Sequence, residues 1–369
     1  MTRKLLTLNG LAVLCVVFYH ATSWGYTAMF WWTDRYQNVS VPNFDQIGNI
    51  TYFGLRVLEQ LVIFAIPAFI FVSGYFIAFA TQRGQNTIGW SVVLNRVKHL
   101  VIPYLLWSIL ILSARWVEGI QYSPDVYLNY LILGRAADPY YYIPLLVSLY
   151  LIAPFLVPLA RKYPGRILIV TGVLQLFLLL IRYPQILNIS LPVLEPLYIL
   201  NRSGFFPTYL FWFCFGMVVG FHLQGFKELL TRFKRGLPMA AILFFCLGML
   251  EWEVLFRLSG QDWIGPKETL IDQLFSASLL LSFLAHDPFP AALTSRLSDL
   301  GGKSFGVYLV HAPVIEYSAR LVYHFLPVLL AFQMGFVVLL ALLALGVPLL
   351  IMAAANRSPG RVAYKYIFG

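Results

Sequence analysis

Charged residues are scarce in this chain of 369 residues, and their scarcity excludes a water-soluble domain. Asp, Glu, Lys and Arg make up 11% of the residues, against about 25% in a typical soluble domain. Hydrophobic residues make up 60% of the chain, and its mean hydropathy is +0.75. Because so few charges cannot cover a surface that faces water, we predict a polytopic membrane protein.

The chain also lacks the residue patterns of several catalytic and metal sites. Its three cysteines, Cys15, Cys214 and Cys246, lie inside apolar runs without metal-ligand spacing, so we interpret them as small buried hydrophobic residues. There is no Walker A loop, dinucleotide-binding fingerprint or Cys-x-x-Cys pair, and no Gly-x-Ser-x-Gly nucleophile elbow surrounds Ser73. We therefore predict no metal and no permanently bound cofactor.

Long apolar runs fill most of the sequence, and about 20 apolar residues are enough for a helix to cross a bilayer. Ten runs qualify, which predicts a single all-α domain, residues 1–369, with about ten transmembrane helices. The start, MTRKLL, resembles a signal peptide, but no clean small-residue cleavage site follows, so we expect an uncleaved first span. The ten runs centre on Leu5–Ser23, Val57–Ala80, Leu100–Arg115, Tyr142–Ala160, Ile167–Ile181, Phe205–Phe221, Leu237–Phe256, Thr269–Ala285, Ser304–Tyr323 and Pro327–Ala353.

Positive charge is concentrated in alternate loops. The formal net charge of +10 could suggest nucleic-acid binding, but the cations form short clusters between apolar runs. About two thirds of the 26 Lys and Arg residues fall on one side, which the positive-inside rule makes cytoplasmic. We therefore predict cytoplasmic termini, an outward-facing loop over Trp24–Ile50, and contact with membrane lipids rather than nucleic acid.

One imidazole, that of His20, closes the apolar run LNGLAVLCVVFYHA in the first predicted span. With a rise of about 1.5 Å per residue counted from Arg3, it lies in the outer half of the bilayer. Ionisable groups at this depth are expensive and usually face the interior of the bundle. His20 is therefore either a structural hydrogen-bonding group or a general base.

A carboxylate beside His20 would fix which ring nitrogen carries the proton. Glu59 and Glu316 are the first candidates for this role, since both lie in the outer half of predicted spans. The alternative for each is an ion pair, with Arg56 or Arg320 as the partner. His311, in SFGVYLVHAPVI of the ninth span, is by itself interpreted as a packing histidine.

Two further segments have a structural and a functional interpretation. NRVKHLVIPYLLWS places Arg96, Lys98 and His99 at the cytoplasmic entrance of the third span. These cations either contact anionic lipids or form a phosphate site, since a guanidinium binds phosphate through two N–H groups. In FVSGYF, Ser73 and Gly74 lie in the inner half of the second span, where small residues favour close helix packing.

Taken together, these segments resemble the acyltransferase-3 family, the integral-membrane O-acyltransferases that modify bacterial cell-surface polysaccharides and other secreted or membrane-bound acceptors. Four stretches carry the resemblance, in the order found in the family: LNGLAVLCVVFYHA, PAFIFVSGYFIA, NRVKHLVIPYLLWS and GKSFGVYLVHAPVI. A fifth, YYYIPLLVSLYLIAPFL, is similar to the central span of the family. The resemblance covers nearly the whole chain.

The resemblance implies an acyl-CoA-dependent O-acyltransferase in the bacterial cytoplasmic membrane. His20 would be the catalytic histidine, acting as general base on an acceptor hydroxyl. Arg96, Lys98 and Arg83 would hold the phosphates of acyl-CoA, the co-substrate, at the cytoplasmic face. The acyl group would be acetyl by family habit, and the acceptor a cell-surface glycan, a glycolipid or another hydroxyl compound.

The tetrahedral intermediate of such a transfer needs hydrogen-bond donors for its oxyanion. Ser73 and Tyr75 are candidates, and His311 matches a further position of the family motif. Where the family usually has an arginine, eleven residues before the histidine, this chain has Asn9. That departure leaves a non-catalytic homologue as one alternative, and a transporter or flippase using the same buried polar residues is another.

Overall fold

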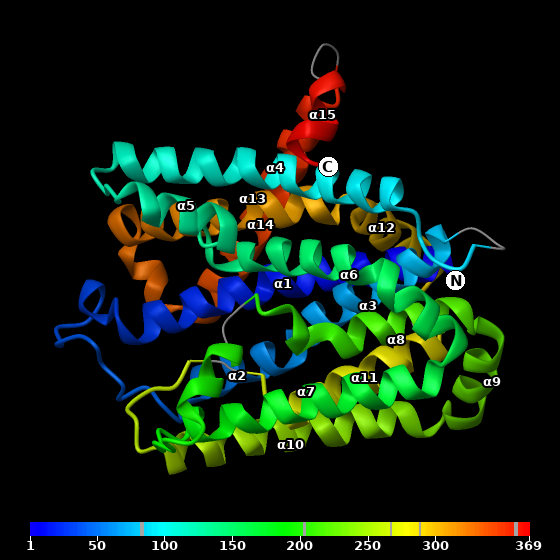
Figure 1. The fold of residues 1–369 in the computed structure, drawn as a ribbon. Helices are drawn as coiled ribbons and strands as arrows, with labels where there is room; N and C mark the ends of the chain where they lie inside the picture. The colour runs from blue at the N-terminus through cyan, green and yellow to red at the C-terminus, as the bar shows by residue number, and fades with distance from the viewer. Residues whose placement is uncertain (82–84, 202–203, 266–267, 288, 358–360) are drawn as a thin grey trace.

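A computed structural model gives the architecture of the chain and describes residues 1–81, 85–201, 204–265, 268–287, 289–357 and 361–369. Within these ranges the chain forms fifteen α-helices and five short 3₁₀ helices, and no β-strand. The longer helices run side by side in one bundle, with α1 (Thr2–Phe30) through its middle (Figure 1). The prediction of an all-α bundle is confirmed.

The remaining elements follow α1 in chain order and alternate long apolar helices with short connecting ones. They are η1 (Thr33–Arg35), α2 (Ile50–Val62), α3 (Ala65–Ala80), α4 (Trp90–Val117), α5 (Pro124–Leu133), η2 (Asp138–Tyr141), α6 (Tyr142–Lys162), α7 (Pro164–Ile186), η3 (Glu195–Asn201), η4 (Phe206–Tyr209), α8 (Leu210–Phe221), α9 (Leu223–Phe233), α10 (Gly236–Ser259), α11 (Leu270–Ala285), α12 (Ala291–Gly302), α13 (Ser304–Phe325), η5 (Pro327–Ala331), α14 (Gln333–Ala355) and α15 (Arg361–Ile367).

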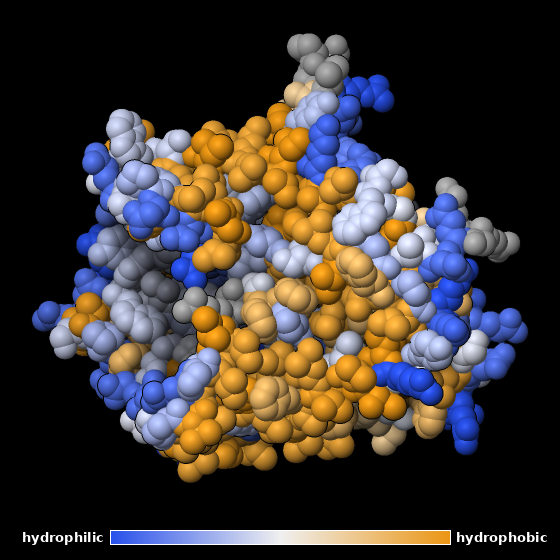
Figure 2. Space-filling model, viewed as in Figure 1, coloured by the Kyte–Doolittle hydropathy of each residue, from blue (hydrophilic) through white to orange (hydrophobic). Residues whose placement is uncertain are grey.

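Seven helical segments of the described chain are long and apolar enough to cross a membrane, or up to eight if the bent pair of α8 and α9 is one span. A broad apolar surface lies between hydrophilic ends at the left and right of the molecule (Figure 2). All ten predicted runs are helical, but α11 has only 16 residues and α13, which includes Glu316 and Arg320, is too polar to qualify. The chain is a membrane protein, and the count of ten spans stays a prediction.

Two element boundaries differ from those predicted. The first helix does not end at Ser23 but continues to Phe30, because the residues before its end are buried against the bundle, including Tyr26 and Met29. The second predicted span is two helices, α2 and α3, separated by a turn at Ile63 and Phe64. Pro67 explains the break, since a proline lacks the amide hydrogen that would bond to the carbonyl of Ile63.

Glycines bring α3 and α8 into backbone contact. A Cβ atom placed on Gly74 would lie 2.0 Å from the carbonyl oxygen of Phe213 on α8. One placed on Gly216 would lie 1.9 Å from the carbonyl oxygen of Phe71 on α3. Small residues allow such close approach of membrane helices, and the predicted packing role of Gly74 is confirmed.

The same device joins α1 to α12. A Cβ atom on Gly10 would lie 1.9 Å from the carbonyl oxygen of Leu297. At the start of α1, the Lys4 Nζ atom donates to Asp287 at 2.9 Å, just beyond the end of α11. This hydrogen bond holds the pKa of the Asp287 carboxyl below its usual value. The beginning of α1 is thus fixed against the end of α11 and the whole of α12.

Candidate active site

Two histidines that are distant in the sequence meet inside the bundle. His20 lies on α1 and His311 on α13, and their ring centroids are 5.4 Å apart with the rings tilted by 49°. The two helices pack directly against each other. His20 is half-buried and His311 has no exposed surface. A small molecule in contact with this pair would therefore reach His20 first.

His311 has one ring nitrogen bonded and the other unpartnered. Its Nδ1 atom lies 2.6 Å from the carbonyl oxygen of Tyr308, one turn earlier in α13. Its Nε2 atom is buried and has no hydrogen-bond partner among the described residues. Buried polar atoms nearly always have a partner, so this nitrogen is available to accept a hydrogen bond.

Two tyrosine hydroxyls hold the segment of α13 that includes His311. Pro313 has no amide hydrogen, so the carbonyl oxygen of Leu309 lacks its helical donor. The hydroxyl of Tyr140, in η2, donates to that oxygen at 2.5 Å, and the hydroxyl of Tyr308 donates back to the carbonyl oxygen of Pro139. These reciprocal bonds were not predicted from the sequence. A proline four residues after Leu309 was the signal that a donor from elsewhere is needed.

Replacing Tyr140 by phenylalanine is expected to destabilise the protein by about 1–3 kcal/mol, because the buried Leu309 carbonyl then has no donor. The measurement is thermal unfolding of the purified protein in lipid nanodiscs. Tyr163→Phe is the matched control, since Tyr163 is 39% exposed. Equal unfolding temperatures for the two variants would contradict the role given to the Tyr140 hydroxyl.

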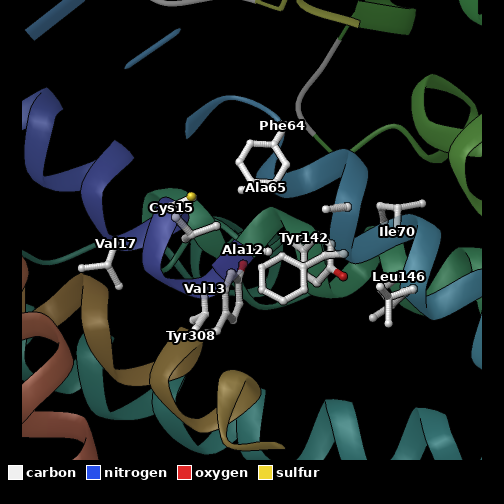
Figure 3. Packing of buried hydrophobic residues seen from close by; sticks show 14 of the residues in the cluster. Ala12, Val13, Cys15, Val17, Phe64, Ala65, Ile70, Tyr142, Leu146 and Tyr308 are labelled. Carbon is white, nitrogen blue, oxygen red and sulfur yellow. The ribbon is translucent and has the colours of Figure 1, made fainter. Parts of the chain in front are cut away.

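Of the predicted oxyanion donors, Ser73 is connected to the histidine pair and Tyr75 is not. The Ser73 side chain interacts with the hydroxyl of Tyr142, and the ring of Tyr142 lies 5.5 Å from that of Tyr308. Both tyrosines lie against α1 beside Ala12 (Figure 3). Tyr75 is buried where α3 faces α8, on the side of Gly220. Ser73 thus belongs to the same connected cluster as His311.

The two predicted carboxylate partners of His20 have other partners. Glu59 is buried, pairs with Arg56 one turn earlier in α2, and accepts from the hydroxyl of Tyr26 at 3.5 Å. Glu316 pairs with Arg320 within α13, and the Nη2 atom of Arg115 lies 3.7 Å from it. Both residues form the ion pairs that the sequence allowed as the alternative.

Within the described ranges, no hydrogen bond or ion pair joins His20 to a carboxylate. The ionisable side chain that faces it is His311. Glu59 or Glu316 could therefore influence His20 only through other side chains.

The predicted phosphate-binding cations lie at the start of α4. Arg96 is half-buried, donates from Nη2 to the carbonyl oxygen of Phe76 on α3 at 3.2 Å, and lies over the ring of Tyr150 at 5.9 Å. Lys98 is exposed. Arg83 lies outside the described residues. A guanidinium has five N–H donors, so Arg96 keeps donors for an anion beside the one that it gives to Phe76.

The surface is hollowed at the end away from the N-terminus. Figure 2 shows this hollow at the left, between the α4–α5 side above and the α7–α10 side below. Among the described residues, no group of three or more His, Cys, Asp and Glu side chains could hold a metal ion. The arrangement can therefore offer the His20 imidazole for proton transfer inside the bundle. It also offers the Arg96 guanidinium beside Phe76, near the C-terminal end of α3.

Comparison with known proteins identifies one family. A family model described as an acyltransferase domain matches residues 7–354. No curated protein and no solved structure gives a significant match. The matched range begins in α1 and ends in α14, so it includes both histidines and the α4 cations.

Proposed function

Since the chain belongs to the acyltransferase-3 family of membrane acyltransferases, we propose that it transfers an acyl group from cytoplasmic acyl-CoA to a hydroxyl group of an extracytoplasmic acceptor. The acyl group is acetyl by family habit. The acceptor is a glycan, a glycolipid or another hydroxyl compound of the cell envelope. The protein would act in the bacterial cytoplasmic membrane.

The observation that carries this proposal is the meeting of His20 and His311 inside the bundle, at a ring distance of 5.4 Å. A bundle that only packs gains nothing from two adjacent imidazoles, because ionisable groups are costly at membrane depth. The half-buried position of His20 supports a role for it in contact with substrate. The hollow at the end of the molecule away from the N-terminus supports an acceptor that arrives from that side (Figure 2).

In the proposed reaction, His20 removes the proton of the acceptor hydroxyl as its oxygen attacks the thioester carbonyl. The tetrahedral intermediate carries its negative charge on the former carbonyl oxygen, for which the Ser73 hydroxyl is a candidate donor. Collapse of the intermediate breaks the carbon–sulfur bond and forms the ester. The proton on His20 then passes to the CoA thiolate, so no net proton is gained or lost.

In this proposal Arg96 binds the acyl donor, acyl-CoA. Acyl-CoA carries its charge on the phosphates, so the nucleotide stays at the face where the α4 cations lie and only the thin pantetheine arm enters the bundle. The hydrogen bond from Arg96 to the Phe76 carbonyl fixes the guanidinium at the end of α3. Lys98, exposed two residues later, would add a second positive charge.

Arg96→Ala is expected to raise the KM for acetyl-CoA by about 10- to 100-fold, the effect of losing hydrogen bonds to a charged group. The kcat should change little, since the guanidinium does not touch the reacting carbonyl. Arg166→Ala is the matched control, because Arg166 is an exposed arginine in the first turn of α7. A KM that rises equally in both variants would point to general surface charge rather than a phosphate site.

The proposed function is tested by acyl transfer from labelled acetyl-CoA, with the purified protein in lipid nanodiscs and a cell-envelope extract as the acceptor pool. Label is expected to move to the extract, and the labelled product then identifies the acceptor. Binding of acetyl-CoA without transfer would favour a non-catalytic homologue, the outcome that Asn9 keeps open. If the protein neither binds acetyl-CoA nor transfers the label, the proposal is overturned in favour of a transporter or flippase.

A further inference from the structure

His311 has a fixed tautomer. A carbonyl oxygen can only accept, so the 2.6 Å contact between His311 Nδ1 and the Tyr308 carbonyl requires the proton to be on Nδ1. The neutral ring then carries its lone pair on Nε2, which is buried and has no partner in the described chain. The Nε2 atom of His311 is therefore a buried hydrogen-bond acceptor without a donor.

The surroundings of His311 make this tautomer rigid. The Tyr140 hydroxyl donates to the Leu309 carbonyl at 2.5 Å, and the Tyr308 hydroxyl donates to the Pro139 carbonyl, so two consecutive residues of α13 are bonded to η2. The ring of Tyr308 also lies 5.7 Å from that of His311. The imidazole cannot rotate away without breaking the contact to the Tyr308 carbonyl.

His20 is the side chain positioned to use the Nε2 atom. Its ring lies 5.4 Å from that of His311. The two rings are not hydrogen-bonded in this structure, since His311 Nε2 has no partner among the described residues, but at this separation a rotation of the His20 ring would aim one of its N–H groups at that nitrogen. The two carboxylates that might have served His20 are both committed to arginines, Glu59 to Arg56 and Glu316 to Arg320. The partner that orients the base is then a neutral imidazole in place of the usual carboxylate.

We infer that His311 is a positioning residue for the acyl transfer: its Nε2 atom accepts a hydrogen bond from one ring nitrogen of His20, which leaves the other ring nitrogen of His20 free to take the acceptor proton. The inference rests on the proposed function. After proton transfer His20 carries two N–H groups, and the one facing His311 stays hydrogen-bonded while the other returns its proton to the CoA thiolate. A bond to a charged donor is stronger than one to a neutral donor, so His311 stabilises His20 most when His20 is protonated.

Three variants of His311 separate positioning from packing. In His311→Gln the amide oxygen reaches the place of Nε2 and keeps an acceptor there. His311→Asn has the same amide on a shorter side chain, so the acceptor is withdrawn while the polarity is kept. His311→Leu removes the acceptor entirely. We expect kcat to fall by about 10- to 100-fold in the Asn and Leu variants, with an unchanged KM for acetyl-CoA, and by no more than about threefold in the Gln variant.

A second readout does not depend on turnover. In protein labelled with ¹⁵N-histidine, a hydrogen bond between the two rings gives magnetisation transfer between one ring nitrogen of His20 and Nε2 of His311. Among the six histidines of the chain, the signals of His20 and His311 are assigned by their absence from the spectra of the His20→Ala and His311→Gln proteins. The transfer is expected in the wild type and should vanish in His311→Leu.

The inference is overturned if the wild type lacks this magnetisation transfer. It is also overturned if kcat falls by the same factor in the His311→Gln and His311→Asn variants. It is also overturned if the His311 variants raise the KM for acetyl-CoA instead, because His311 would then contact the donor. If the rings are coupled but the wild type moves no label, the pairing stands and it is the proposed function that fails. If His20→Ala keeps its activity while the His311 variants lose theirs, the two roles are reversed.

Discussion

His20→Ala is expected to lower the kcat for acyl transfer by about 10²–10⁴-fold, the usual contribution of a positioned general base. Binding of acetyl-CoA should persist, because the cations that would hold its phosphates lie on α4 and not on α1. The fold should also persist, since His20 makes no hydrogen bond to another described residue and is half-buried rather than part of the tight core. The measurement combines steady-state transfer with a separate acetyl-CoA binding assay.

His324→Ala is the matched control for this variant. His324 lies exposed near the end of α13, next to Tyr323 and away from the paired rings. Its loss should change neither kcat nor KM. Transfer by His20→Ala at the wild-type rate would make His20 a structural residue and would remove the mechanism proposed above.

Arg56→Met is expected to destabilise the protein by about 3–5 kcal/mol, because it leaves the carboxylate of Glu59 buried without its ion-pair partner. Both side chains are almost fully enclosed, with exposures of 3% and 5%. The guanidinium also lies over the ring of Trp252, at 4.1 Å from its centroid, so α2 loses a contact to α10 as well. Thermal unfolding in nanodiscs, followed by intrinsic fluorescence and by activity, measures the loss.

Two comparisons separate this buried pair from ordinary surface charge. Arg320→Ala breaks the ion pairs of Arg320 with Glu118 and Glu316. Because the Arg320 side chain is 39% exposed and its two partners are 32% and 23% exposed, the loss should cost no more than about 1 kcal/mol. The double variant Arg56→Met/Glu59→Leu removes both charges and should recover much of the lost stability. A double variant as unstable as Arg56→Met alone would show that packing around Trp252, and not the unpaired charge, is what matters.

The sequence predicted the features that depend on composition and local pattern. The apolar runs placed every long helix, because burial in lipid demands an unbroken apolar stretch. The break between α2 and α3 was missed, although Pro67 marks it locally, because the hydropathy stays high through the turn. The extension of α1 to Phe30 was missed because its last turns face protein rather than lipid, a fact set by neighbours and not by the run itself.

The sequence suggested candidate residues for the site but not their arrangement. His20, Arg96 and His311 were each found from their segments, since an ionisable residue in an apolar run is visible by inspection. His20 faces His311, and not a carboxylate, because α13 packs against α1. The spacing of residues within either segment does not predict this packing. The same holds for the Tyr140 hydroxyl, whose partner lies far along the chain on α13.

The glycine crossings described above have a mechanical consequence. Two helices whose backbones touch at Gly74 and Phe213, or at Gly10 and Leu297, cannot slide past each other without a steric clash. Because α1 also packs on α3, the four helices α12, α1, α3 and α8 form one stiff beam across the bundle. We therefore expect a movement that admits a substrate to occur in the helices outside this group of four. His20 lies on α1, so we expect it to keep its place relative to these four helices.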